Sequence, residues 1–329
     1  MTFVDEGLAT RPGFARTFRP DDLTLGLMFP LESYDGPIPR MDVGEQVALA
    51  QLAERVGFAA LWARDVPLLD PGFGDAGQMF DPWVWLTHIA GNTSQIALAT
   101  GSTVFPLRNP IDIAKAAASL DLLCDGRLIL GAATGDRGVE FPAYGLDRQL
   151  SGDLFRAGVG AVRRLWADDF PALDSPFGVM RDAGLLPKPA GRRIPVLITG
   201  NSRQTVQWIA EHGDGWLMYP RPLRQQYHVL RSWEEALEEV GSNRKPFAQS
   251  LYVDLVDQPG AAPVAIHLGY RTGHHYLIEH LAALREIGVN HVIINLKYGR
   301  RPVDDVLREL AEAVLPHLSP ATSQQPSGT

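Results

Sequence analysis

The sequence predicts a closed (β/α)8 barrel of the TIM-barrel class, with insertions in the loops at the carboxyl ends of its strands. Short apolar runs alternate with longer amphipathic runs eight times along the chain. The short runs are continuously apolar, as is typical of parallel strands buried on both faces. Eight successive strand–helix units are what a closed parallel barrel requires, whereas an open doubly wound sheet rarely reaches eight.

Each predicted unit is a strand followed by a helix. The strands are expected at residues 23–29, 58–63, 96–103, 128–133, 194–199, 215–219, 250–256 and 291–296. The helices are expected at residues 41–56, from 81, 109–123, 154–166, 202–212, 223–240, 274–287 and 303–315. Asp42 and Glu45 have capping-box spacing, and Asp81 and Asn109 each precede a proline, which is favoured at the first helical position.

Four connections are long: 66–80, 134–152, 167–193 and 257–272. The first, second and fourth leave the carboxyl ends of strands, where barrel active sites lie. The fourth is expected to be a mobile lid that closes over a ligand, with Arg271 reaching toward a phosphate or substrate. A static surface loop is the alternative.

We expect one barrel domain at 21–318, preceded by an N-terminal extension at 1–20. The Pro/Ser/Gln-rich tail at 319–329 is expected to be disordered. No apolar run approaches the ~18 residues of a membrane span, and the N-terminus lacks the apolar region of a signal peptide. The chain is therefore expected in the cytoplasm.

Charge and composition exclude several classes of function. A formal charge of −8 argues against nucleic acid, since phosphate binding needs a basic stripe. The nine histidines show no metal-binding spacing, so no metal is expected. No nucleophile elbow is present, and a Schiff base at Lys297 is not favoured. The single cysteine, Cys124, lies in an apolar stretch and is expected to be buried and inert.

Two of the segments at strand ends contain glycine. At 100–110, Gly101 would allow unusual backbone geometry and a flat surface that a planar ring could approach. Residues 131–138, with Thr134 and then Glu140, do not match the dinucleotide motif G-x-G-x-x-G. Ordinary strand ends or turns remain open for both segments.

Two further segments carry polar side chains. A helix opening in residues 199–205 would present backbone N–H groups, hydroxyls and a guanidinium to a phosphate. Its candidate ligands are Gly200, Asn201, Ser202, Arg203 and Thr205. Simple capping of the helix is the alternative. After the second strand, Arg64 and Asp65 are interpreted either as an ion pair or as pocket residues.

Together these segments resemble the bacterial luciferase-like, flavin-dependent monooxygenase superfamily. The resemblance covers about residues 23–318. It rests on residues 45–58, 61–62, 81–83, 99–110, 119–131 and 209–216. The run 119–131 is the most specific part.

The resemblance implies an enzyme that binds FMN at the strand carboxyl ends. It places a cis peptide bond, Gly101–Ser102, beneath the isoalloxazine ring, and Asn201, Ser202 and Thr205 at the phosphate. In such enzymes reduced flavin reacts with O2, and the flavin hydroperoxide oxygenates a small organic substrate. A separate flavin reductase and a homodimer are also expected.

Two departures leave the acid–base residue open. Luciferases carry a histidine where this chain has Val66, and a reactive cysteine near the position of Ala133. Light emission is therefore not implied. Asp65, Arg64 and Tyr219 are substitutes by position only.

Relatives that use a deazaflavin often have a Gly-Pro turn where this chain has Asn201-Ser202, which favours FMN over a deazaflavin. A flavin-binding barrel without turnover and an unrelated barrel lyase or hydrolase remain open.

Overall fold

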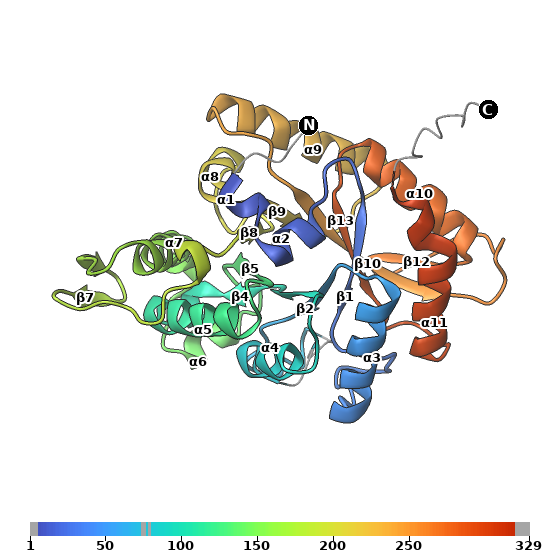
Figure 1. The fold of residues 1–329 in the computed structure, drawn as a ribbon, viewed down its shortest axis with the longest axis horizontal. Helices are drawn as coiled ribbons and strands as arrows, with labels where there is room; N and C mark the ends of the chain where they lie inside the picture. The colour runs from blue at the N-terminus through green and yellow to red at the C-terminus, as the bar shows by residue number, and fades with distance from the viewer. Residues whose placement is uncertain (1–5, 74–76, 78–79, 320–329) are drawn as a thin grey trace, which may run out of the picture.

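A closed barrel of eight parallel strands forms the centre of the molecule. The computed structural model describes residues 6–73, 77 and 80–319. The barrel strands are β1 (Thr24–Met28), β2 (Ala60–Ala63), β3 (Ala97–Thr100), β5 (Leu128–Ala133), β8 (Val196–Thr199), β9 (Gly215–Met218), β10 (Phe247–Leu255) and β13 (His291–Asn295). Each pairs in parallel with its neighbours in this order, and the pairing of β13 with β1 closes the ring (Figure 1). The predicted fold class is confirmed.

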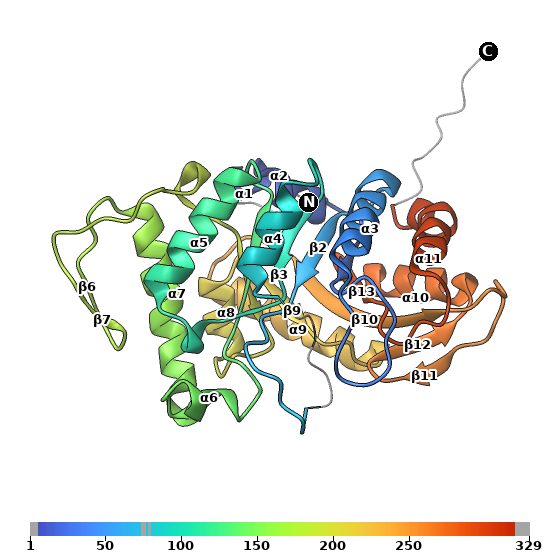
Figure 2. The ribbon, with the colours of Figure 1, turned by 90° about the horizontal axis from the view of Figure 1, so that it is seen from below.

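Helices surround the strands (Figures 1 and 2). They are α3 (Val43–Val56), α4 (Pro82–Ala90), α5 (Pro110–Leu123), α7 (Ser151–Ala167), α8 (Val206–His212), α9 (Leu223–Glu239), α10 (His274–Glu286) and α11 (Val303–Glu309). The expected caps form, because the side chains of Asp42, Asp81 and Asn109 each accept a backbone N–H of the first turn. No helix in the described part of the chain is long and apolar enough to cross a membrane.

Helix α8 begins later than the sequence predicts. Ser202 and Arg203 have φ of 45° and 55°, in the left-handed region, so residues 200–204 form a loop rather than a helical turn. Thr205 is the N-cap, and its Oγ1 accepts the N–H of Trp208 at 3.2 Å. The prediction of a helix from residue 202 was wrong. Asn201, Ser202 and Thr205 can each cap a helix, so the sequence alone does not decide at which of them α8 begins.

Several short elements lie in the insertions. β4 (Thr103–Val104) pairs with β5, and α6 (Glu140–Ala143) follows β5. β6 (Leu173–Ser175) and β7 (Gly178–Met180) form a hairpin that projects at the left of Figures 1 and 2. The β6–β7 hairpin lies within the connection that the sequence analysis left without structure.

The expected lid is an ordered hairpin. β11 (Val264–Ile266) pairs antiparallel with β12 (Gly269–Thr272), and β12 pairs in parallel with β10 (Figure 2). The prediction that Arg271 reaches toward a ligand was wrong. Arg271 Nη1 lies 2.8 Å from Oδ2 of Asp254, a buried carboxylate that requires a counter-charge.

The amino end of the barrel is covered by the N-terminal segment. Helices α1 (Glu6–Ala9) and α2 (Pro12–Thr17) bury Leu8, Phe14 and Phe18 against side chains of the barrel interior. Residues 6–18 of the expected extension are therefore packed onto the domain. Ser319 ends the described chain, and the rest of the expected disordered tail, 320–329, lies outside the described residues.

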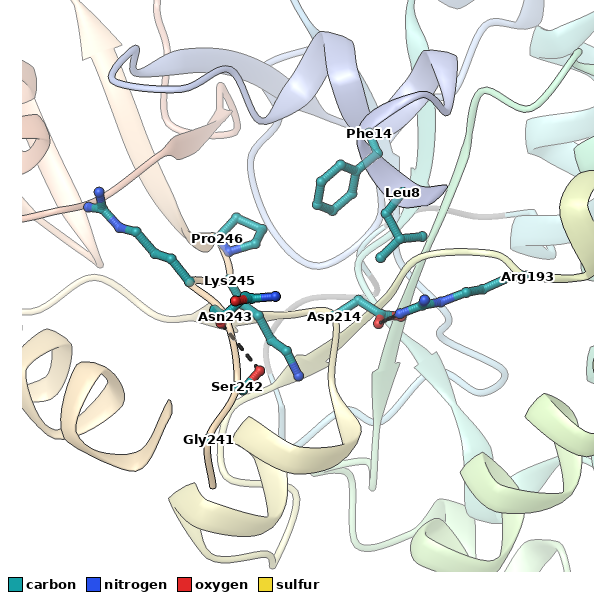
Figure 3. A pocket seen from close by; sticks show the side chains of 10 residues that line it. Leu8, Phe14, Arg193, Asp214, Gly241, Ser242, Asn243, Lys245 and Pro246 are labelled. Atoms are coloured by element: carbon teal, nitrogen blue, oxygen red, sulfur yellow. Dashed lines mark hydrogen bonds and ion pairs between the residues drawn. The ribbon is translucent and has the colours of Figure 1, made fainter. Parts of the chain in front are cut away.

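A cavity of about 250 Å³ lies at this amino end, where Leu8 and Phe14 face Asp214 and the 241–246 segment (Figure 3). Asp214 is paired with Arg163 and Arg193. Lys245 Nζ donates to the carbonyls of Ala210 and Gly213. These charged groups hold together the segments at the amino end of the barrel. We therefore assign the cavity a structural role at that end.

A histidine occupies the barrel interior. His291 Nε2 accepts the indole N–H of Trp62 at 3.0 Å, and its Nδ1 lies 2.7 Å from Oγ1 of Thr24. Burial lowers the pKa of His291 to about 3. The ring is therefore neutral, and it fixes the indole that lies beneath the cleft described next.

Candidate active site

The carboxyl ends of the barrel strands open into one cleft with two parts. The larger part has a volume of about 670 Å³ and the smaller about 260 Å³. The two parts share Arg64, Phe73, Gly101, Asp136, Thr199 and Tyr219. A cleft of several hundred Å³ at this end of a barrel is typical of a small-molecule site.

The floor is formed where β3 ends. Gly101 and Ser102 line the cleft and are joined by a cis peptide bond, as predicted. The hydroxyls of Ser102 and Thr199 are hydrogen-bonded. A Cβ at Gly101 would lie 3.2 Å from Met28 Cε and 3.3 Å from Trp62 Cε3. The ledge, as we call Gly101 and Ser102, therefore rests directly on the barrel interior.

The loop at residues 200–204 closes the smaller part. Gly200, Ser202 and Thr134 line it, as the sequence analysis expects of pocket residues. The backbone N–H groups of Ser202 and Arg203 make no hydrogen bond within the described residues. Successive free N–H groups in such a conformation form a concave anion site, or nest. The hydroxyl of Ser202 donates to the carbonyl of Thr199 at 2.7 Å.

The structure does not bring all the predicted phosphate ligands into the cleft. Asn201, Arg203 and Thr205 are exposed and their side chains do not line either part. Arg203 Nη1 instead lies 3.4 Å from the carbonyl of Gln149. The left-handed backbone there carries the Arg203 side chain toward the start of α7, and its predicted contact with a phosphate stays a prediction.

Asp65 is part of an ion-pair network. Its Oδ2 lies 2.8 Å from Nε of Arg108 and its Oδ1 2.7 Å from Nη2, and it also accepts the N–H of Val104 at 3.0 Å. Arg108 Nη2 lies 2.7 Å from Asp81 as well. Burial alone would lower the pKa of Arg108, but these carboxylates outweigh it and raise the pKa. The partner of Asp65 is thus Arg108, which the sequence analysis gave no role, and not Arg64.

Arg64 and Tyr219 line both parts of the cleft. Desolvation raises the pKa of Tyr219, Asp136 raises it further, and Arg64 and Arg137 oppose the rise. The phenol therefore keeps its proton at neutral pH and can donate a hydrogen bond into the cleft, although the residue as a whole is 53% exposed.

The connection after β5 adds charged residues to the cleft. Asp136 and Arg137 line it, and the Arg137 guanidinium lies 4.2 Å from the ring centroid of Phe73. Behind them, Glu140 is buried, and desolvation raises its pKa to about 7, with Asp65 and Asp136 adding to the rise and Arg137 opposing it. The sequence analysis quoted this segment but assigned Asp136, Arg137 and Glu140 no role. Their spacing carries no known motif.

Metal chemistry has no visible site here. Among the residues that the structure describes, no group of three or more His, Cys, Asp or Glu side chains is placed to hold a metal ion.

Comparison with known proteins identifies the family. The model of the family described as "Luciferase-like monooxygenase" matches residues 24–270, from the first barrel strand into β12. The chain belongs to this family. The likeness that the residues indicated is therefore confirmed, and the family consists of oxidoreductases that include monooxygenases.

Members of the luciferase-like monooxygenase family with similar sequences differ in cofactor. An F420-dependent hydroxymycolic acid dehydrogenase of Mycobacterium tuberculosis is 31% identical over 221 residues, which span 66% of this chain and 58% of that enzyme. The oxygenase component of a flavin-dependent trigonelline monooxygenase of Acinetobacter baylyi is 29% identical over 128 residues, 38% of this chain and 34% of the other. An uncharacterized protein of Mycobacterium tuberculosis is 31% identical over 189 residues, 53% of this chain and 67% of the other.

Solved structures share the fold. An F420-dependent secondary alcohol dehydrogenase matches with a TM-score of 0.75 at 19% identity, over 91% of this chain and 100% of the other. A monooxygenase from Streptomyces bottropensis matches with a TM-score of 0.72 at 21% identity, over 90% of this chain and 99% of the other. At these identities the likeness shows the luciferase-like barrel and no more.

Proposed function

We propose that the protein is a flavin-dependent monooxygenase that uses reduced FMN and O2 to oxidise a small organic molecule. One observation carries the proposal. A single cleft joins the ledge at Gly101 and Ser102 to an anion nest at residues 200–204. A planar ring attached to a phosphate has the two features that this pairing would recognise.

The residues present fit such a cofactor. The N–H groups of Ser202 and Arg203, with Thr134 at the strand end beside them, would hold the phosphate. The ring would lie over the ledge, where glycine lets the backbone lie close against Met28 and Trp62 beneath it. When bound, the reduced flavin would supply the electrons that activate O2.

The chain's own groups would orient the substrate and exclude water. Tyr219 would donate its phenol proton to an oxygen in the cleft, because its raised pKa keeps it protonated. Arg64 would offer positive charge to the same space. Met28, Leu217 and Ile293 give the larger part an apolar wall, which strengthens these polar contacts. In this proposal Asp65 is structural, since Arg108 already occupies its carboxylate.

A deazaflavin-dependent oxidoreductase is the second candidate. It is favoured by the relatives named for F420, among them the mycolic acid dehydrogenase. The oxygenase component from Acinetobacter baylyi favours FMN, and its name supports a separate reductase that would supply reduced flavin. The homodimer predicted from the resemblance stays a prediction.

Titration separates the candidates. Fluorescence quenching would be measured with oxidised FMN, with reduced FMN under anaerobic conditions, and with F420. We expect reduced FMN to bind most tightly and to consume O2 when a reductase recycles it. Tight binding of F420 with no binding of FMN would replace the proposal by the second candidate. Binding of neither would reject both.

A further inference from the structure

The larger part of the cleft ends in a group of aromatic rings on the side away from the nest. Tyr252 comes from β10, His267 from the turn of the β11–β12 hairpin, and Tyr298 from the chain just after β13. The ring centroids of Tyr252 and Tyr298 are 5.2 Å apart, those of Tyr252 and His267 5.7 Å, and those of His267 and Tyr298 6.3 Å. Three separate elements thus present rings to one space.

The hairpin is held close enough to complete this group. A Cβ at Gly269 would lie 1.8 Å from the carbonyl oxygen of Tyr252, so only glycine lets β12 approach β10 here. The N–H of Tyr252 donates to the carbonyl of Leu268 at 3.1 Å. Both contacts press the turn, with His267 and Leu268, against the mouth of the cleft.

Tyr298 is supported from behind. Lys297 Nζ lies 5.9 Å from its ring centroid and 4.4 Å from that of Tyr34, and it donates to the carbonyl of Gly36 at 3.0 Å. Lys297 is buried, and its ammonium group contacts protein atoms of the 34–36 segment. One side of the Tyr298 ring therefore faces this buried lysine, although the residue as a whole is 37% exposed.

Two polar side chains at this end carry no charge. Ser250 and Asn295 line it, and Asn295 Oδ1 accepts the backbone N–H of Lys297 at 3.0 Å, which leaves its amide N–H2 as the group offered to the cleft. Among the described lining residues, the charged side chains Arg64 and Asp136 belong to the part shared with the nest. Among the described residues, no lysine or arginine lines the ring-lined end.

We infer that this ring-lined subsite binds the substrate, and that the substrate is a flat aromatic molecule with a neutral hydroxyl or carbonyl group. The subsite comprises Ser250, Tyr252, His267, Leu268, Asn295 and Tyr298. Ring edges and faces favour an aromatic guest, and the imidazole and amide match a phenol or ketone oxygen. The inference rests on the proposed function in placing the substrate beside a flavin; the binding itself does not depend on it.

The test uses 1-naphthol, decanal and benzoate as probes on the full chain, with and without FMN, by calorimetry. We expect 1-naphthol to bind at least tenfold more tightly than the aliphatic and the anionic probe, and not to compete with FMN. His267→Ala and Tyr298→Leu should each weaken 1-naphthol at least fivefold and change FMN binding less than twofold. His267→Asn, which keeps a polar group at the turn, should lose less than His267→Ala.

The control is His228→Ala. His228 meets Tyr227 on the exposed face of α9 with centroids 5.7 Å apart and an interplanar angle of 62°, nearly the geometry of His267 and Tyr252. It should leave 1-naphthol binding unchanged. Tighter binding of decanal or benzoate, unchanged 1-naphthol affinity in folded His267→Ala, or competition with FMN would each overturn the inference. Loss of FMN binding alone, with the 1-naphthol pattern intact, would count only against the proposed function.

Discussion

Asp65 and Arg108 form a two-point ion pair across 43 positions of sequence, between the end of β2 and the start of α5. The Asp65 side chain is 1% exposed and that of Arg108 24%. The pair therefore fixes the two segments that flank the ledge. This geometry favours a structural role for Asp65, and the acid–base role that its position suggested stays a prediction.

Asp65→Asn is expected to lower the free energy of unfolding by about 2–4 kcal/mol, because it leaves a partly buried guanidinium with one carboxylate instead of two. Urea unfolding followed by tryptophan fluorescence measures this. Asp153→Asn is the control; its pair with Arg156 is exposed and should contribute less than ~1 kcal/mol. Full stability of Asp65→Asn together with lost turnover would restore the catalytic interpretation.

Glu140 should make stability depend on pH. Its folded pKa of about 7 lies above the usual 4.5, so the unfolded chain releases this proton first as the pH rises. The native protein therefore loses stability between about pH 4.5 and 7. Glu140→Gln removes that loss. We expect the variant to equal the native protein at pH 4.5 and to be more stable by about 3 kcal/mol at pH 8. A difference that does not change with pH would contradict this.

The anion nest predicts a distinction between FMN and riboflavin. Ser202→Ala removes the bond from the hydroxyl to Thr199 that shapes the loop, so we expect FMN binding to weaken about tenfold. Riboflavin, which lacks the phosphate, should be unaffected. Arg203→Ala should change FMN affinity less than twofold, because that side chain lies outside the cleft. Equal losses for both ligands in Ser202→Ala would point to a disturbed barrel instead of a phosphate site.

Arg127 is expected to be essential for stability. The side chain is buried, and its guanidinium donates to the carbonyls of Cys124, Ile96, Ala90 and Thr93 and to the Thr93 hydroxyl. Arg127→Met would leave these acceptors without a donor and should cost about 3–5 kcal/mol by thermal or urea unfolding. Arg156→Met, at an exposed site, should cost less than ~1 kcal/mol. A loss below ~1 kcal/mol at Arg127 would show that water replaces the guanidinium.

Arg127 lies in the run 119–131, the part of the sequence that carries the most specific resemblance. Asp121 in the same run is fully buried and paired with Arg11, and it accepts the N–H of Ala190 at 3.0 Å. The two residues thus hold several segments together, and neither lines the cleft.

The barrel could be predicted because each of its strands is a short apolar run in the local sequence. The β11–β12 hairpin was not, since its strands are short and are stabilised by pairing with β10 rather than by their own sequence. Several cleft residues could be predicted because the carboxyl ends of parallel strands converge at one edge of the barrel. They are Arg64, the ledge, Thr134, Gly200, Ser202 and Tyr219. The ring-lined subsite could not be predicted from the sequence, because Tyr252, His267 and Tyr298 come together only through tertiary packing.

Strand β10 divides its length between two tasks. Residues 247–252 pair with β9 or β13 and complete the ring, and residues 253–255 pair with β12 alone; Tyr252 pairs with both β13 and β12. Tyr252 is the residue at which β10 changes from pairing within the ring to pairing with the hairpin. The closed ring therefore takes none of its strand pairing from the β11–β12 hairpin. Substitutions in the turn at His267 and Leu268 would thus change the mouth of the cleft without touching a strand pairing that closes the barrel.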